Sequence, residues 1–224
     1  MKKVMVTMIA VMFAVMLMSA PQAAQASLIY ISEIYGGGGA TSGSPTYNHD
    51  YIELYNNSSV AIDLSGWSIQ YASATGTFNS TNMHSLSGVI GAYSHFLIQE
   101  SNPPGTPGTT GADLPVTPNY NGQLNLSATA GKVALVDSST VISGTGSAGG
   151  YVDLIGYGTT ANFNNGKPLT AALTNTTAVF QANDGTLSIG TPVPHAAETP
   201  IPAAAWLLGS GLMGLVGIRK KISI

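Results

Sequence analysis

Short segments in which apolar and polar residues alternate run through the middle of the chain, separated by Gly, Asn, Ser and Pro. In one of them Ile52 and Leu54 fall on one face of a strand, while Tyr51, Glu53 and Tyr55 fall on the other. An apolar repeat of about 3.6 residues is not sustained over three turns anywhere in this region. The pattern therefore predicts an all-β domain. The predicted strands are residues 28–35, 51–55, 67–71, 93–99, 123–126, 132–136 and 151–155.

Short strands with turn signals between them predict a β-sandwich. Trp67 shares a strand face with Ile69, and we assign it to the core. Residues 36–49 and 101–121 are rich in turn-forming residues, which predicts two exposed loops. Residues 159–195 are polar and irregular, and they predict a loop, one or two edge strands and a linker.

The beginning of the chain, residues 1–26, has the pattern of a secretory signal peptide. Two lysines precede an uncharged apolar run at residues 4–18, and an Ala-Gln-Ala triplet ends at Ala26. This pattern predicts cleavage between Ala26 and Ser27. The alternative is a short membrane anchor, but the run is shorter than the ~18 residues that a spanning helix needs.

A second apolar segment lies near the other end, at residues 201–218. As a helix it would be roughly 27 Å long, close to the roughly 30 Å thickness of the hydrocarbon core. Arg219, Lys220 and Lys221 follow it, and the positive-inside rule places such a cluster in the cytoplasm. The alternative is a buried core helix, which the four glycines of the segment disfavour. We therefore expect a transmembrane helix that leaves the body of the chain outside.

The residues around this helix also carry a sorting motif. Pro200, Ile201 and Pro202 precede Ala-Ala-Ala-Trp-Leu-Leu-Gly-Ser-Gly, and the three cations close the segment. Residues 196–224 thus resemble a PEP-CTERM signal, which implies that an exosortase in the inner membrane recognises and cuts them. The name-giving form of the motif has Pro-Glu-Pro where this chain has Thr-Pro-Ile-Pro. The cleavage point therefore stays open.

Blocks in the body of the chain carry a second resemblance. Residues 50–56 contain Ile-Glu-Leu-Tyr-Asn, residues 62–69 contain Leu-Ser-Gly-Trp, and residues 152–158 read Val-Asp-Leu-Ile-Gly-Tyr-Gly. Together with residues 28–35 they resemble a lamin tail domain. The resemblance implies an immunoglobulin-like β-sandwich over residues 27–195. The closing part departs from the family, because a lone aspartate stands where bacterial members often have an acidic stretch.

Composition narrows the classes of function that remain. Charged residues make up 8% of the chain, against roughly 25% in an ordinary soluble domain. Residues 27–199 hold two basic and ten acidic residues, a formal net charge of −8, which excludes a nucleic-acid partner. The chain has no cysteine, which excludes a disulfide scaffold and thiol catalysis.

Glu33, Asp50 and Glu53 are the candidate metal ligands, since carboxylates are the groups that Ca²⁺ prefers. Asp50 and Glu53 are three positions apart in a strand, so their side chains should point to opposite faces. The lamin tail resemblance favours a role in the fold, in which these carboxylates hydrogen-bond loop amides. One bound Ca²⁺ is the alternative, and we expect no other cofactor.

Tyr51 and Tyr55 share the strand face that we expect to be exposed, and they are the candidate glycan contacts. Ordinary strand composition is the simpler explanation of the tyrosines. His84, His95 and His195 each stand alone, and we expect His95 to face solvent. Sequence motifs for a serine hydrolase, a zinc protease or an EF-hand do not accompany them.

The leading hypothesis is a non-enzymatic, exported bacterial protein of the cell surface or extracellular matrix. The C-terminal helix would anchor it in the inner membrane, transiently before exosortase cleavage or permanently without it. The sandwich would then act as a structural or adhesive element of the biofilm, in contact with exopolysaccharide. A calcium- or ligand-binding module is the alternative, and a hydrolase is the least favoured.

Overall fold

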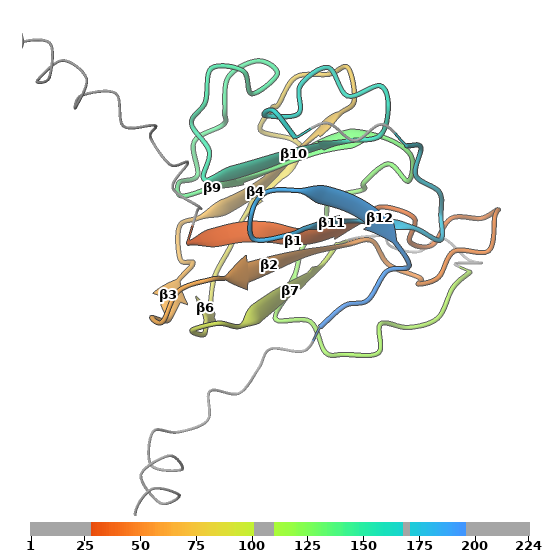
Figure 1. Cartoon of the computed structure of the whole chain (residues 1–224), viewed down its shortest axis with the longest axis horizontal. Coiled ribbons are helices and arrows are strands. Elements are labelled where there is room, and N and C mark those ends of the chain that lie inside the picture. Colours follow the sequence, from red (N-terminus) through yellow and green to blue (C-terminus); the bar gives the residue numbers. More distant parts are fainter. Residues whose placement is uncertain (1–27, 101–109, 168–170, 196–224) are drawn as a thin grey trace, which may run out of the picture.

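The computed structural model describes residues 28–100, 110–167 and 171–195, which form an all-β domain (Figure 1). One sheet has six strands, a second has four, and two short strands form a separate ribbon. In order across it, the first sheet contains β12 (Leu187–Gly190), β11 (Ala178–Gln181), β1 (Ile29–Tyr35), β2 (Tyr51–Asn56), β7 (His95–Gln99) and β8 (Tyr120–Asn121). The second contains β10 (Asp153–Tyr157), β9 (Gly131–Val136), β4 (Ser68–Ser73) and β5 (Met83–Ser85). The ribbon pairs β3 (Ile62–Asp63) with β6 (Val89–Ile90).

The two large sheets pack face to face around one core, as in a β-sandwich (Figure 1). Ile52 and Leu54 of the six-stranded sheet belong to the same apolar cluster as Ile69 and Leu135 of the four-stranded sheet. This confirms the inward face that the alternation in β2 predicts. Trp67 is only half-buried, and it packs against the edge of the cluster.

A β-bulge in β1 shapes the outer face of the six-stranded sheet. Ile31 lies opposite Leu54 and Glu33 lies opposite Glu53, so Ser32 is an extra residue between them. Its hydroxyl reaches the Glu53 carboxylate on the outer face at 3.0 Å. The bulge therefore places two successive residues, Ser32 and Glu33, on the outer face.

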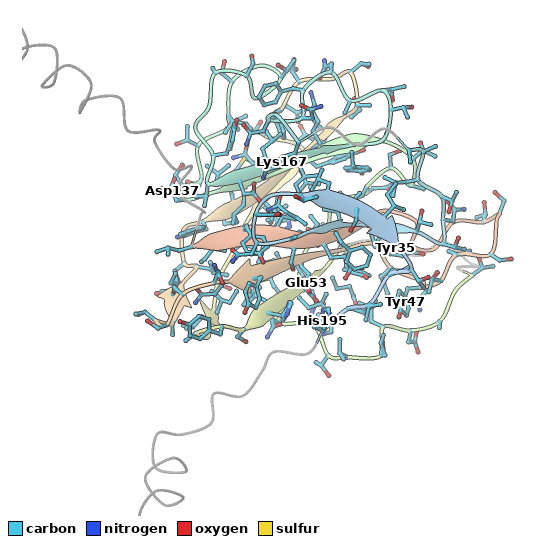
Figure 2. The ribbon with its side chains drawn as sticks, viewed as in Figure 1. Tyr35, Tyr47, Glu53, Asp137, Lys167 and His195 are labelled. Atoms are coloured by element: carbon cyan, nitrogen blue, oxygen red, sulfur yellow. The ribbon has the colours of Figure 1, made fainter. Side chains whose placement is uncertain are left out.

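A buried carboxylate ties the two sheets together. Asp153 at the start of β10 accepts hydrogen bonds from the backbone N–H of Ile31 at 2.9 Å and from the side chain of Gln181 at 3.0 Å. Both partners lie in the six-stranded sheet. Lys167, from the loop after β10, forms an ion pair with the same carboxylate; Figure 2 shows the place of Lys167 in the domain.

The expected strand at residues 123–126 does not form, for a reason that the hydrogen bonds reveal. The backbone N–H of Leu124 donates to Glu100 Oε2 at 2.9 Å, and that of Leu126 donates to Asp50 Oδ2 at 2.8 Å. Buried carboxylates thus satisfy amides that a neighbouring strand would otherwise pair. Both leucine side chains are buried in the core.

The irregular segment near the end of the domain contributes two strands, β11 and β12. β12 lies at the sheet edge, as expected, whereas β11 sits between β12 and β1.

The loop at 36–49 is largely half-buried rather than exposed, since only residues 41–44 are open to solvent. The N–H groups of Thr46 and Tyr47 donate to the hydroxyl of Tyr35, which holds this loop against the sheet.

In the part of the chain that the structure describes, no helix is long and apolar enough to cross a membrane. The predicted signal peptide at 1–26, its cleavage site between Ala26 and Ser27, and the predicted helix at 201–218 lie outside the described residues. The same is true of the sorting motif at Pro200, Ile201 and Pro202 and of the cations Arg219, Lys220 and Lys221.

Candidate functional site

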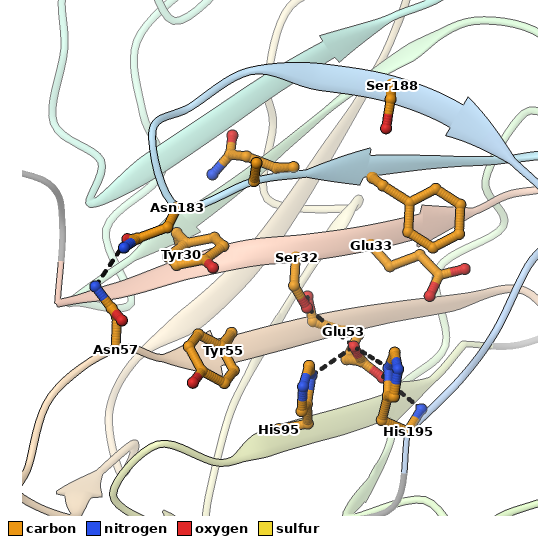
Figure 3. Close-up of a pocket in the computed structure, with 13 residues that line it drawn as sticks. Tyr30, Ser32, Glu33, Glu53, Tyr55, Asn57, His95, Asn183, Ser188 and His195 are labelled. Carbon is orange, nitrogen blue, oxygen red and sulfur yellow. Dashed lines mark hydrogen bonds and ion pairs between the residues drawn. The ribbon is translucent and has the colours of Figure 1, made fainter.

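A groove of about 590 Å³ runs over the outer face of the six-stranded sheet (Figure 3). Aromatic rings and amides line most of it, and carboxylates and imidazoles line one end. The aromatic and amide residues are Tyr30, Tyr55, Phe180, Asn57, Gln181 and Asn183. The residues at the charged end are Glu33, Glu53, His95 and His195.

The buried carboxylate of Glu53 organises the charged end of the groove. Its Oε1 accepts hydrogen bonds from Ser32 Oγ at 3.0 Å and faces Nδ1 of His95 at 2.7 Å and Nδ1 of His195 at 3.0 Å. Its Oε2 accepts the backbone N–H of His195 at 2.7 Å. Four parts of the chain therefore meet at one carboxylate: β1, β2, β7 and the segment after β12 (Figure 3).

The two imidazole rings lie against each other beside this carboxylate. The ring centroids of His95 and His195 are 4.4 Å apart with an interplanar angle of 21°, and the His95 ring also lies 4.8 Å from that of Tyr55. The His95 side chain is 20% exposed and the His195 side chain 47% exposed. The expectation that His95 is isolated and solvent-facing is wrong, because Glu53 and His195 hold it.

Electrostatics at Glu53 favour the ionised form. Burial acts to raise the pKa of Glu53, but the hydrogen bonds from His95 and from the His195 backbone, with the charges of both imidazoles, bring it below its usual 4.5. The carboxylate is therefore charged at neutral pH and available to a cation or to hydrogen-bond donors.

Glu33, the cross-strand neighbour of Glu53, behaves in the opposite way. Its Oε1 accepts hydrogen bonds from the Tyr51 hydroxyl and from the Val193 N–H, the latter at 3.0 Å, while its buried Oε2 has no hydrogen-bond partner. Burial raises the pKa of Glu33 to about 7, although these two hydrogen bonds oppose the shift. The nearby charge of Glu53 adds to the increase.

The structure does not bring Asp50 together with Glu33 and Glu53 as a set of calcium ligands. Asp50 Oδ1 accepts the Gly38 N–H at 2.8 Å, and Oδ2 accepts the Leu126 N–H at 2.8 Å. Both of its oxygens therefore bond loop amides, which is the role in the fold predicted beside the calcium alternative. Burial raises the pKa of Asp50 to about 8 against the effect of these two bonds.

The structure places the two candidate glycan contacts, Tyr51 and Tyr55, in different surroundings. Tyr51 is fully buried in a cluster with Tyr35, Leu97 and Ala178, so it cannot touch a glycan. The correction follows from the loops around Tyr47 and Leu114, which cover the outer face at that end of β2. Tyr55 does line the groove.

Sequence reasoning missed Tyr30, whose ring lies beside that of Tyr55 on the adjacent strand. Tyr30 is the cross-strand partner of Tyr55, and the two ring centroids are 5.7 Å apart. The register that brings Tyr30 opposite Tyr55 depends on the bulge at Ser32, which alternation does not reveal. The pairing of β2 with β7 places His95 opposite Tyr55, but no strand pattern points to His195.

A second histidine–carboxylate pair lies elsewhere in the fold. His84 Nε2 is 2.7 Å from Oε1 of the buried Glu100, and its ring stacks on Tyr120 with the centroids 5.3 Å apart. Glu100 Oε2 accepts the Leu124 N–H. This pair contains one imidazole where the groove contains two, and it provides a natural control for experiments on the groove.

The hydroxyl in the groove is not placed for nucleophilic catalysis. Ser32 Oγ donates to two oxygens of Glu53, the backbone carbonyl at 3.2 Å and Oε1 at 3.0 Å. A serine nucleophile needs a histidine as its immediate base, with the carboxylate behind the histidine. Here the Glu53 carboxylate contacts both the Ser32 hydroxyl and the imidazoles. The groups are therefore not arranged as hydroxyl, histidine and carboxylate in that order, as a catalytic triad requires.

Comparison with known proteins identifies the fold. The family model described as Lamin Tail Domain matches residues 22–159, more than half of the chain. No curated protein matches the chain. Among solved structures, a DUF4876 family protein from Bacteroides thetaiotaomicron aligns over 79% of this chain and 72% of its own, with 11% identity and a TM-score of 0.44.

Proposed function

Because the chain belongs to the lamin tail domain family, a family of typically non-catalytic immunoglobulin-like modules, we propose that it is an exported binding module. Its ligand is a segment of extracellular polysaccharide, held in the groove on the outer face of the six-stranded sheet. The observation that carries this proposal is the lining of the groove, which combines aromatic rings with amide side chains.

Sugar rings have apolar faces that stack on aromatic side chains and hydroxyls that both donate and accept hydrogen bonds. Tyr30 and Tyr55 offer two neighbouring rings on adjacent strands. The amides of Asn57 and Asn183 bond each other at 2.7 Å across the end of the groove, so donor and acceptor groups are already positioned there. An amide carries both functions, which suits a hydroxyl-rich ligand.

The sequence of the terminal segments supports the same role. Its patterns favour export through a signal peptide and sorting by an exosortase, and a predicted helix at 201–218 would hold the chain in the inner membrane before cleavage. The low charge of the body supports a hydrated polysaccharide partner at the cell surface or in the biofilm matrix.

The proposal is tested by measuring the affinity of the purified chain for exopolysaccharide of the producing bacterium. We expect Tyr55→Ala to weaken binding at least about fivefold, because an aromatic contact of this kind contributes on the order of 1 kcal/mol or more. Tyr93→Ala is the matched control, since Tyr93 is exposed at 55% and does not line the groove. Equal binding by both variants, or no binding by the wild type, would contradict the proposal.

A further inference from the structure

We propose that Glu53, His95 and His195 form a binding site for a divalent transition metal, with Zn²⁺ as the best match. The three side chains each offer one ligand atom, and these atoms all lie within 4.8 Å of one another. This site does not depend on the groove binding a glycan. It also differs from the predicted calcium site, with which it shares only Glu53.

The ligand atoms already converge on a common point. Nδ1 of His95 and Nδ1 of His195 lie 2.7 and 3.0 Å from Glu53 Oε1 (Figure 3). Ligand atoms around a tetrahedral zinc ion are ~3.3 Å apart, given Zn–N and Zn–O distances of ~2.0–2.1 Å. Small rotations of the three side chains would therefore open the space for an ion. Each imidazole would then carry its proton on Nε2 and present the lone pair of Nδ1.

The type of ligand selects the type of metal. Two imidazoles and one carboxylate suit Zn²⁺, Cu²⁺ or Ni²⁺, whereas Ca²⁺ takes six to eight oxygen ligands. Three protein ligands leave a fourth position of a zinc ion open. His95 and His195 are the more exposed members, so that position faces the groove and its solvent.

No lysine or arginine of the described residues occupies the place that a metal ion would take beside Glu53. The basic side chains in contact with Glu53 are the two imidazoles, His95 and His195. Among residues 28–100, 110–167 and 171–195, the only lysines or arginines are Lys132 and Lys167. Lys132 bonds Gly76 and Asn162, and Lys167 bonds Asp153 and Gln181, so neither competes with a metal ion for Glu53.

Neighbouring groups also hold the proposed ligands in position through hydrogen bonds and ring contacts, as is usual around metal ligands. Ser32 Oγ donates to Glu53 Oε1, and the His195 N–H donates to Oε2, which together fix the plane of the carboxylate. The ring of His95 rests on that of Tyr55. The side chains are therefore oriented before a metal arrives.

Metal binding would have a structural consequence at the end of the domain. The segment after β12 contacts the sheet through the Val193 N–H on Glu33 and through His195 on Glu53. A metal held by His195 and by two residues of the sheet would clamp this segment in place. The site thus couples a bound ion to the position where the chain leaves the domain.

The test uses the full chain without a polyhistidine tag, purified in mild detergent and stripped of metal with EDTA. Calorimetry with ZnCl₂ should show one equivalent bound. The melting temperature should rise by about 5–10 °C once zinc exceeds its Kd by about a hundredfold. Ca²⁺ should neither bind in its place nor displace it.

Single variants decide whether the named residues are the ligands. We expect His195→Ala and His95→Gln each to weaken zinc binding at least about tenfold and to abolish the visible absorption of bound Co²⁺. His195 follows the last strand, so its variant should keep the wild-type circular dichroism spectrum. His84→Ala is the matched control and should bind zinc like the wild type.

The proposal is overturned if the wild type shows neither heat nor a thermal shift with zinc. It is also overturned if the folded His195→Ala variant binds zinc as tightly as the wild type, or if His84→Ala is the variant that loses it.

Discussion

Replacing Asp153 with asparagine should destabilise the domain more than any change at an exposed carboxylate. Asp153 accepts four hydrogen bonds, from the N–H groups of Ile31 and Leu154, from the Gln181 amide and from Lys167. Two of them come from the opposite sheet and one comes from a cation. The residue is 4% exposed, so water cannot replace the lost bonds.

The expected loss of stability in Asp153→Asn follows from the hydrogen bonds that an asparagine can keep and those that it cannot make. Asparagine retains one acceptor oxygen but turns an NH₂ group toward two donors, and it removes the charge that faces Lys167. Hydrogen bonds to charged groups contribute about 1.5–3 kcal/mol each, and breaking a buried ion pair costs about 3–5 kcal/mol. Lys167 is 18% exposed and can turn partly to solvent, so we expect a loss of about 3–4 kcal/mol.

Urea denaturation of wild type and variant measures this loss as a difference in the free energy of unfolding. Asp137→Asn is the matched control, because Asp137 is an exposed carboxylate just beyond β9 (Figure 2). Its variant should stay within about 0.5 kcal/mol of the wild type. A loss below about 1 kcal/mol for Asp153→Asn would refute the idea that this carboxylate ties the sheets together.

Further predictions concern single residues. Glu33 has a folded pKa of about 7, above its usual 4.5, so the folded state holds more protons between these values. The protonated Glu33 side chain therefore stabilises the folded state fully below about pH 4.5, and this contribution is lost as the pH rises through 7. Glu33→Gln in metal-free buffer should remove the pH dependence, which amounts to up to about 3 kcal/mol of unfolding free energy at pH 8. If urea titrations give wild type and variant the same pH profile, the raised pKa of Glu33 is contradicted. Gly38→Ala should cost more than about 2 kcal/mol, because its Cβ would lie 1.9 Å from the backbone carbon of His49. Gly144→Ala is the control, because its Cβ meets nothing within 4 Å although its φ is +60°, and it should cost less when both variants are compared by urea denaturation.

Alternation along the sequence predicts the long strands well, because burial of one face imposes a period of two. Ile52 and Leu54 are core residues for this reason. The same reasoning fails for β3 and β6, which have two residues each and are too short to show a period. It also fails at Leu124 and Leu126, whose amides bond side-chain carboxylates that are remote in sequence.

The candidate site is harder to predict than the fold, because it depends on register and on one irregular segment. The bulge at Ser32 shifts β1 by one residue and places Glu33 opposite Glu53, which no pattern in β1 indicates. His95 could be placed by pairing β7 with β2. His195 reaches Glu53 from beyond the last strand, 142 positions away along the chain, where alternation carries no information.

The proposed binding of polysaccharide in the groove is tested most directly by mapping where the polysaccharide contacts the domain. Hydrogen–deuterium exchange of the chain with and without exopolysaccharide of the producing bacterium reports which amides become protected. We expect protection at Tyr55–Asn57 and at the turn around Asn183, which border the groove on the outer face of the six-stranded sheet. Protection confined to the four-stranded sheet, or no protection at saturating polysaccharide, would contradict the assignment of the groove as the binding site.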